Sequence, residues 1–70
     1  MNRIIFKGVK EINIDFLVLR ARPDEIDVYK NGEYHSTCES YSWNGCNVWC
    51  DVYPALNGEL KYTWHIDKED

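Results

Sequence analysis

The sequence predicts one all-β domain spanning residues 1–70, an antiparallel meander of five or six strands curled into a twisted sheet or small barrel. Three observations support this fold class. Asn-Gly pairs recur at Asn31-Gly32, Asn44-Gly45 and Asn57-Gly58, evenly spaced along the chain. The segments between them are rich in Tyr, Trp, Val and Thr, which favour strands. No helical period fits those segments as well as alternation does.

Each Asn-Gly pair predicts a hairpin. A two-residue type I′ turn needs positive φ at both central residues, and Asn and Gly adopt it readily. We therefore expect three Asn-Gly hairpins joining four strands, at about 26–30, 33–42, 46–54 and 59–66.

Two-residue turns also fix the register between strands. The expected opposite pairs are Lys30/Glu33, Tyr29/Tyr34, Val28/His35, Trp43/Cys46, Tyr41/Val48, Glu39/Cys50, Tyr53/Tyr62, Asp51/Trp64 and Cys50/His65. Alternation then assigns one face to Tyr29, Tyr34, Trp49, Tyr53, Leu60, Tyr62, Trp64 and Ile66. The other face receives Ile26, Val28, Tyr41, Trp43, Cys46, Val48, Cys50, Val52 and Leu56. Both faces are partly apolar, so one meets the core and the other is covered or binds a partner.

The N-terminal third supplies further sheet. Residues 4–6 form a short strand, Gly8 allows a turn, and residues 11–19 read as one strand entering the core. Residues 20–25 are expected to be a connection, because Pro23 removes a ladder donor and disfavours helix before it. An alternative makes residues 23–31 a short helix, but the spacing of Ile26 and Val28 favours a strand.

Charge is unevenly distributed along this chain, whose formal net charge is −4. Residues 1–22 hold five basic and two acidic residues, whereas residues 23–70 hold three basic and ten acidic ones. The acidic part would repel duplex DNA and suits a protein partner with a basic surface. We find no signal-peptide pattern and no apolar run of about 18 residues, so no membrane span is expected.

The thiols and imidazoles raise the question of metal binding or catalysis. Three cysteines without a secretory context predict reduced thiols and a cytoplasmic location. Cys38, Cys46, Cys50, His35 and His65 are zinc-ligand types, but they lack Cys-x2-Cys spacing. A small zinc-stabilised module built on Cys46, Cys50 and His65 stays open as an alternative. We predict no catalytic residue, cofactor or metal, and no enzymatic activity.

A second alternative is a single-stranded nucleic-acid-binding small β barrel. Aromatic rings could stack with bases while basic residues follow the phosphates. The rings would be those of Tyr29, Tyr34, Trp49, Tyr53, Tyr62 and Trp64, and the bases Arg3, Lys7, Arg20 and Arg22. The excess of acidic residues argues against nucleic acid as the partner.

The preferred interpretation is a small acidic, non-enzymatic protein-binding module. Trp and Tyr are favoured at interface hot spots, so Trp43, Trp49, Tyr53 and Trp64 are the expected contacts where they are exposed. Asp24, Glu25 and Asp27 would steer a basic partner electrostatically. A short acidic chain of this kind is typical of the viral inhibitors that phages and mobile elements direct at a host protein. An exposed sheet edge could also pair with a second copy to form a homodimer.

Overall fold

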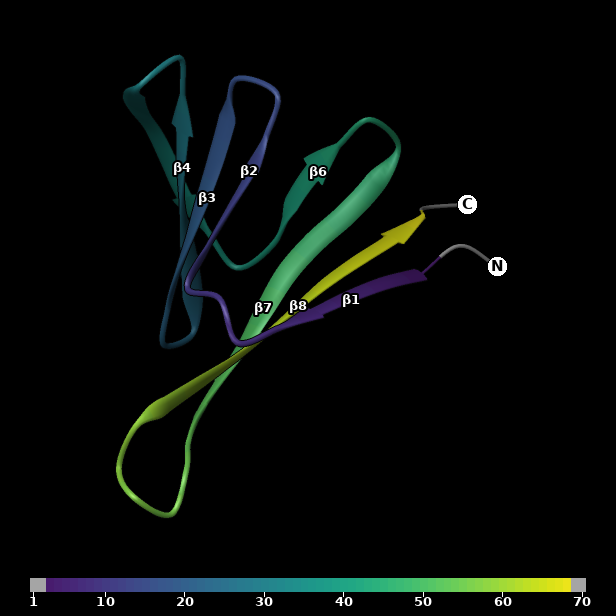
Figure 1. The fold of residues 1–70 in the computed structure, drawn as a ribbon. Coiled ribbons are helices and arrows are strands. Elements are labelled where there is room, and N and C mark those ends of the chain that lie inside the picture. Colours follow the sequence, from purple (N-terminus) through teal and green to yellow (C-terminus); the bar gives the residue numbers. More distant parts are fainter. Residues whose placement is uncertain (1–2, 69–70) are drawn as a thin grey trace.

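The computed structural model describes residues 3–68, which form eight β-strands and no helix. The strands are β1 (Arg3–Lys7), β2 (Glu11–Ile14), β3 (Leu17–Arg22), β4 (Glu25–Lys30), β5 (Glu33–Cys38), β6 (Tyr41–Trp43), β7 (Cys46–Pro54) and β8 (Leu60–Lys68). They build two antiparallel four-stranded sheets (Figure 1). Sheet A has the order β1-β8-β7-β6, and sheet B has the order β2-β3-β4-β5. The all-β prediction is confirmed, with more strands than expected and in two sheets.

The strands of sheet B are joined by tight turns, and the sequence predicted only some of them. The single strand expected at 11–19 is wrong, because the chain reverses at Asp15-Phe16, with Asp15 at φ 54°. The connection expected at 20–25 is also wrong. β3 continues to Arg22 and pairs with β4 from Glu25, so the turn is Pro23-Asp24 alone. Proline followed by a residue at positive φ, here 71°, is the type II turn pattern. The alternative helix over 23–31 is excluded by β4.

The strand expected at 33–42 is divided. β5 ends at Cys38 and β6 begins at Tyr41, and the two strands belong to different sheets. Glu39 and Ser40 therefore carry the chain from sheet B to sheet A. A single meander running from residue 26 to 66 is thus wrong. Two sheets can bury their apolar faces against each other, whereas one open sheet would leave one of those faces in water.

The hairpin registers differ in how well local pattern predicted them. Around Asn44-Gly45, Trp43 lies opposite Cys46 and Tyr41 opposite Val48, as expected. Glu39, expected opposite Cys50, lies outside β6 and in the crossover instead. Around Asn31-Gly32, the pairs Lys30/Glu33 and Tyr29/Tyr34 also occur. A register shift at the next residue then places Val28 opposite Ser36 rather than His35.

The third turn is a longer loop. Pro54 pairs with Leu60, so residues 55–59 connect β7 to β8, and the expected register is wrong by one residue. Within this loop Gly58 has positive φ, and the Asn57 side chain accepts a hydrogen bond from the Glu59 amide at 3.0 Å.

The observed β7–β8 pairs include Trp49/His65, Cys50/Trp64, Asp51/Thr63, Val52/Tyr62 and Tyr53/Lys61. A slip of one residue moves side chains to the opposite face. Tyr62, Trp64 and Ile66 therefore share a face with Cys50 and Val52, not with Trp49 and Tyr53 as expected, and that face meets the core.

The core lies between the two sheets. Its buried apolar residues are Ile12, Leu17, Leu19, Ala21, Ile26, Val28, Val48, Trp64 and Ile66. Trp64 is completely buried, and its indole Nε1 donates to the Val9 carbonyl at 2.8 Å. That bond ties β8 to the segment joining β1 and β2. Leu56, assigned to the same face as Val48 and Val52, lies in the β7–β8 loop instead and is fully exposed.

Candidate protein-binding groove

An open groove of about 510 Å³ runs beside residues 49–53 of β7. Trp49, Asp51 and Tyr53 alternate along this strand and therefore point to one face of sheet A. Asp24 from the β3–β4 turn and Glu39 from the crossover line the same groove, together with Cys50 and Val52. We call it the acidic groove. It joins three separate parts of the chain.

The Trp49 ring is held in place by a neighbour on β8. His65 lies directly opposite Trp49, and their rings stack with centroids 4.8 Å apart and planes 9° from parallel. Asp51 Oδ2 accepts a hydrogen bond from His65 Nε2 at 2.9 Å. The hydrogen bond orients the imidazole, and the stack orients the indole. The orientation of the Trp49 ring is therefore fixed by its neighbours, and preorganisation of this kind lowers the entropic cost of an interaction.

The lining carries one sign of charge. Asp24, Glu39 and Asp51 contribute carboxylates, and no Lys or Arg lines the groove among the described residues. Asp51 retains 60% of its side-chain exposure, and Tyr53 is half exposed. A concave surface with one sign of charge concentrates its field and attracts the opposite charge. The arrangement therefore suits a cationic side chain held against aromatic rings.

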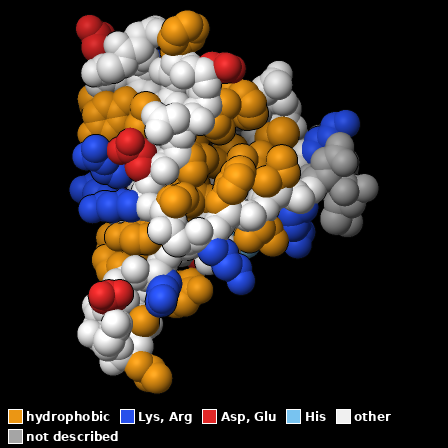
Figure 2. Space-filling view, in the orientation of Figure 1, with side chains coloured by type: hydrophobic (Ala, Val, Ile, Leu, Met, Phe, Trp, Pro, Cys, Tyr) orange, Lys and Arg blue, Asp and Glu red, His pale blue; other side chains and the backbone are white. Residues whose placement is uncertain are grey.

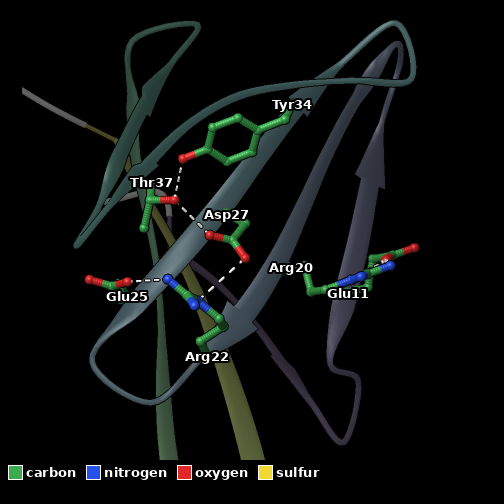
Figure 3. Close-up of polar contacts among 7 residues, drawn as sticks. All are labelled: Glu11, Arg20, Arg22, Glu25, Asp27, Tyr34 and Thr37. Carbon is green, nitrogen blue, oxygen red and sulfur yellow. Dashed lines mark hydrogen bonds and ion pairs between the residues drawn. The ribbon is translucent and has the colours of Figure 1, made fainter.

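The other two predicted steering residues, Glu25 and Asp27, form ion pairs within sheet B. Arg22 pairs with Glu25 and, at 3.3 Å, with Asp27 (Figure 3). The Thr37 hydroxyl donates to Asp27 Oδ1 at 2.7 Å, and Thr37 in turn contacts the Tyr34 hydroxyl at 2.6 Å. These contacts link β3, β4 and β5 across sheet B. Because Arg22 faces both carboxylates, Glu25 and Asp27 offer less free charge than Asp24 does.

The structure brings together three of the seven predicted contact residues. Asp24, Trp49 and Tyr53 line the acidic groove, whereas Trp43 lines two other surface grooves. Trp64 is buried, so the condition of exposure attached to it is not met. Sequence reasoning missed Glu39, Asp51 and His65. Glu39 carried no signal as part of an expected strand. Asp51 was considered only as the expected partner of Trp64, and His65 only as a partner of Cys50 and a zinc-ligand type.

The cysteines are arranged for packing. Cys50 lies opposite Trp64 and not opposite His65, so that expected pair is wrong. Burial, with a smaller contribution from Asp51, raises the pKa of Cys50 to about 11, although a hydrogen bond with the Thr63 backbone lowers it. Burial also raises the pKa of Cys38. Such thiols stay protonated and weakly nucleophilic at neutral pH. Within residues 3–68, no three His, Cys, Asp or Glu side chains are grouped to hold a metal ion.

The rings expected to form one nucleic-acid-stacking face are dispersed. Tyr29 and Tyr34 pack edge-on in sheet B, with centroids 5.8 Å apart. Trp49 and Tyr53 are on sheet A, and Trp64 is in the core. The arginines are also engaged, Arg3 with Asp67, Arg20 with Glu11, and Arg22 with Glu25 and Asp27.

No helix able to cross a membrane occurs in the part of the chain that the structure describes. No protein-family model matches this chain, and neither a curated protein nor a solved structure is similar to it. The groove geometry is therefore the basis on which a function can be argued.

Proposed function

We propose that this protein is a small, non-enzymatic protein-binding module that recognises a basic segment of another protein through the acidic groove. The observation that carries the proposal is the convergence of Asp24, Trp49 and Tyr53 on one groove. They come from two parts of the chain. From residue type alone, Trp49 and Tyr53 were predicted as contacts and Asp24 as a steering charge. A Lys or Arg side chain would lie between the carboxylates and the rings, where ion pairing and cation–π attraction act together.

Inhibition of a host protein is a more specific form of this proposal. It rests on an analogy of size and charge with small acidic inhibitors, and on the same groove. A protein that only occupies a basic surface needs no catalytic group of its own. The groove would suffice for that role.

The test is capture of partners from a lysate of the source organism, with nuclease added, by wild-type protein and by two matched variants. Trp49→Ala removes a groove ring, whereas Tyr34→Ala removes a ring that is 60% exposed on sheet B. A stoichiometric, nuclease-resistant partner should be lost with Trp49→Ala and kept with Tyr34→Ala. Hot-spot truncations weaken binding by about 30-fold or more.

Two variants that each remove one negative charge test the electrostatic part of the proposal. Asp24→Asn should reduce the association rate and its salt dependence, whereas Glu33→Gln, at an exposed position at the start of β5, should not. Equal effects of the two substitutions would mean that the overall negative charge of the protein attracts the partner, and not this groove. A partner that dissociates with nuclease would contradict the proposal.

A further inference from the structure

The edge strand β1 has the features of a docking site that is separate from the acidic groove. Among the described residues, β1 pairs only with β8, which leaves its other side open. All five of its residues are exposed. Ile4, Ile5 and Phe6 keep 52%, 48% and 43% of their surface in water. Natural edge strands are usually protected against pairing with a strand of another molecule, so an uncovered apolar edge indicates a partner.

The backbone of this edge has a defined polarity. The Gly8 amide donates to the Tyr62 carbonyl at 2.9 Å, which places Gly8 among the residues bonded to β8. In an antiparallel pair, bonded and non-bonded residues alternate. The N–H and C=O groups of Lys7, Ile5 and Arg3 therefore point away from β8. These are the groups with which an additional strand would pair.

An apolar groove of about 450 Å³ continues from the inward side of β1. Its lining includes Ile4 and Phe6 of β1, Ile12 and Ile14 of β2, and Ile66 of β8. In Figure 2, hydrophobic side chains gather in the middle of the face where Figure 1 shows β2 diverging from β1 and β8. A strand added to β1 would direct every second side chain into this groove.

Charge decides which strand fits. Arg3, Ile5 and Lys7 share the outward face of β1, since residues two apart along a strand share a face. A second copy pairing antiparallel about Ile5 would place Arg3 of each copy opposite Lys7 of the other, and like charges directly opposite each other are destabilising. Carboxylates at those positions would instead pair with the bases. Arg3 already contacts Asp67, but its guanidinium has further donors.

We propose that β1 binds an extended, acidic segment of a partner protein by strand addition, with apolar residues at alternate positions entering the groove. This partner chemistry is opposite to that proposed for the acidic groove. The two sites can therefore be tested independently, and failure of one leaves the other standing. Backbone pairing would supply affinity, and the alternating apolar and acidic side chains would supply specificity.

The probe is a capped peptide of about seven residues that alternates Glu with Val, matching the length of an edge strand. Binding is followed by anisotropy of the labelled peptide and by amide hydrogen exchange of the protein. We expect saturable binding and slower exchange at Ile5 and Lys7, with no change at Phe6, whose amide already faces β8. A peptide N-methylated on its pairing edge should bind at least about tenfold more weakly, because it cannot donate to the ladder.

Charge variants complete the test. Lys7→Glu should weaken binding of the acidic peptide by about tenfold, since it replaces an attractive cross-strand pair by a repulsive one. Lys30→Glu is the matched control, because Lys30 lies against Tyr41 of β6, at the other edge of sheet A. The proposal is overturned by no saturable binding, by protection away from β1, or by equal binding of a Lys/Val peptide. Concentration-dependent protection of Ile5 and Lys7 without peptide would also overturn it, in favour of a second copy.

Discussion

Replacing Trp64 by Phe tests the β7–β8 register, on which the composition of the core depends. Trp64 is completely buried and donates its indole N–H to the Val9 carbonyl. Loss of that hydrogen bond costs about 1 kcal/mol. Phe also has roughly three fewer side-chain heavy atoms than Trp. The loss of these buried atoms costs about 2 kcal/mol at the usual transfer value per buried group. The expected total, about 3 kcal/mol, is large against the roughly 4–10 kcal/mol typical of a domain this size.

The assay is urea unfolding followed by far-ultraviolet circular dichroism, which does not depend on tryptophan emission. Trp49→Phe is the matched control, because it keeps an aromatic ring beside His65 on the outward face of sheet A. It should cost less than about 1 kcal/mol, as surface substitutions usually do. If Trp49→Phe were the more damaging change, Trp64 would face outward, and the pairing of Cys50 with Trp64 would be refuted.

Two further predictions concern the turns and the partly buried thiol of Cys50. Gly45→Ala should destabilise by about 1 kcal/mol, because φ is 76° and no atom lies within 4 Å of an added Cβ, so only backbone strain changes. Asn57→Ala should destabilise the protein less, because the positive φ in that loop belongs to Gly58. Thermal unfolding of both variants measures the order, and the reverse order would contradict the difference between the two loops. Because burial raises the pKa of Cys50 from 9.0 to about 11, the folded state holds that proton more tightly. Stability should be undiminished by this group below pH 9.0 and fall as pH rises toward 11, by about 1 kcal/mol after allowing for partial exposure. Cys50→Ala should show a shallower decline over that range, and an unchanged slope would contradict the assignment.

Local preference explains the parts of the fold that the sequence predicted well. β7 spans Cys46–Pro54, the range expected from its residues, and its pairing with β6 follows from Asn44-Gly45. Both depend on interactions within a few residues, namely side-chain alternation and the ease with which Asn and Gly adopt positive φ. The two-residue turn predicted within residues 55–59 is wrong for a similarly local reason. Asn57 there uses its side chain to accept from a backbone amide, so the pair does not act as a two-residue turn.

The candidate site was predicted by residue type but not as a constellation. Trp49, Tyr53 and Asp24 were selected because aromatic and acidic residues suit recognition of a basic partner. Glu39 reaches the same groove only because the chain crosses between sheets at residues 39–40. No local pattern marks that crossover. It depends on whether residues 33–42 gain more by staying in one sheet or by dividing between two.

By itself the sequence determined an all-β chain, several of its strands and an acidic C-terminal portion, because strand propensity, turn preference and charge are properties of neighbouring residues. Only the tertiary structure decided that Trp64 is core while Trp49 is surface, and that Asp24 joins β7 across the two sheets. The physical reason is that burial is shared between distant segments. Two half-apolar sheets become stable by covering each other, and a one-residue shift in register determines which side chains are covered.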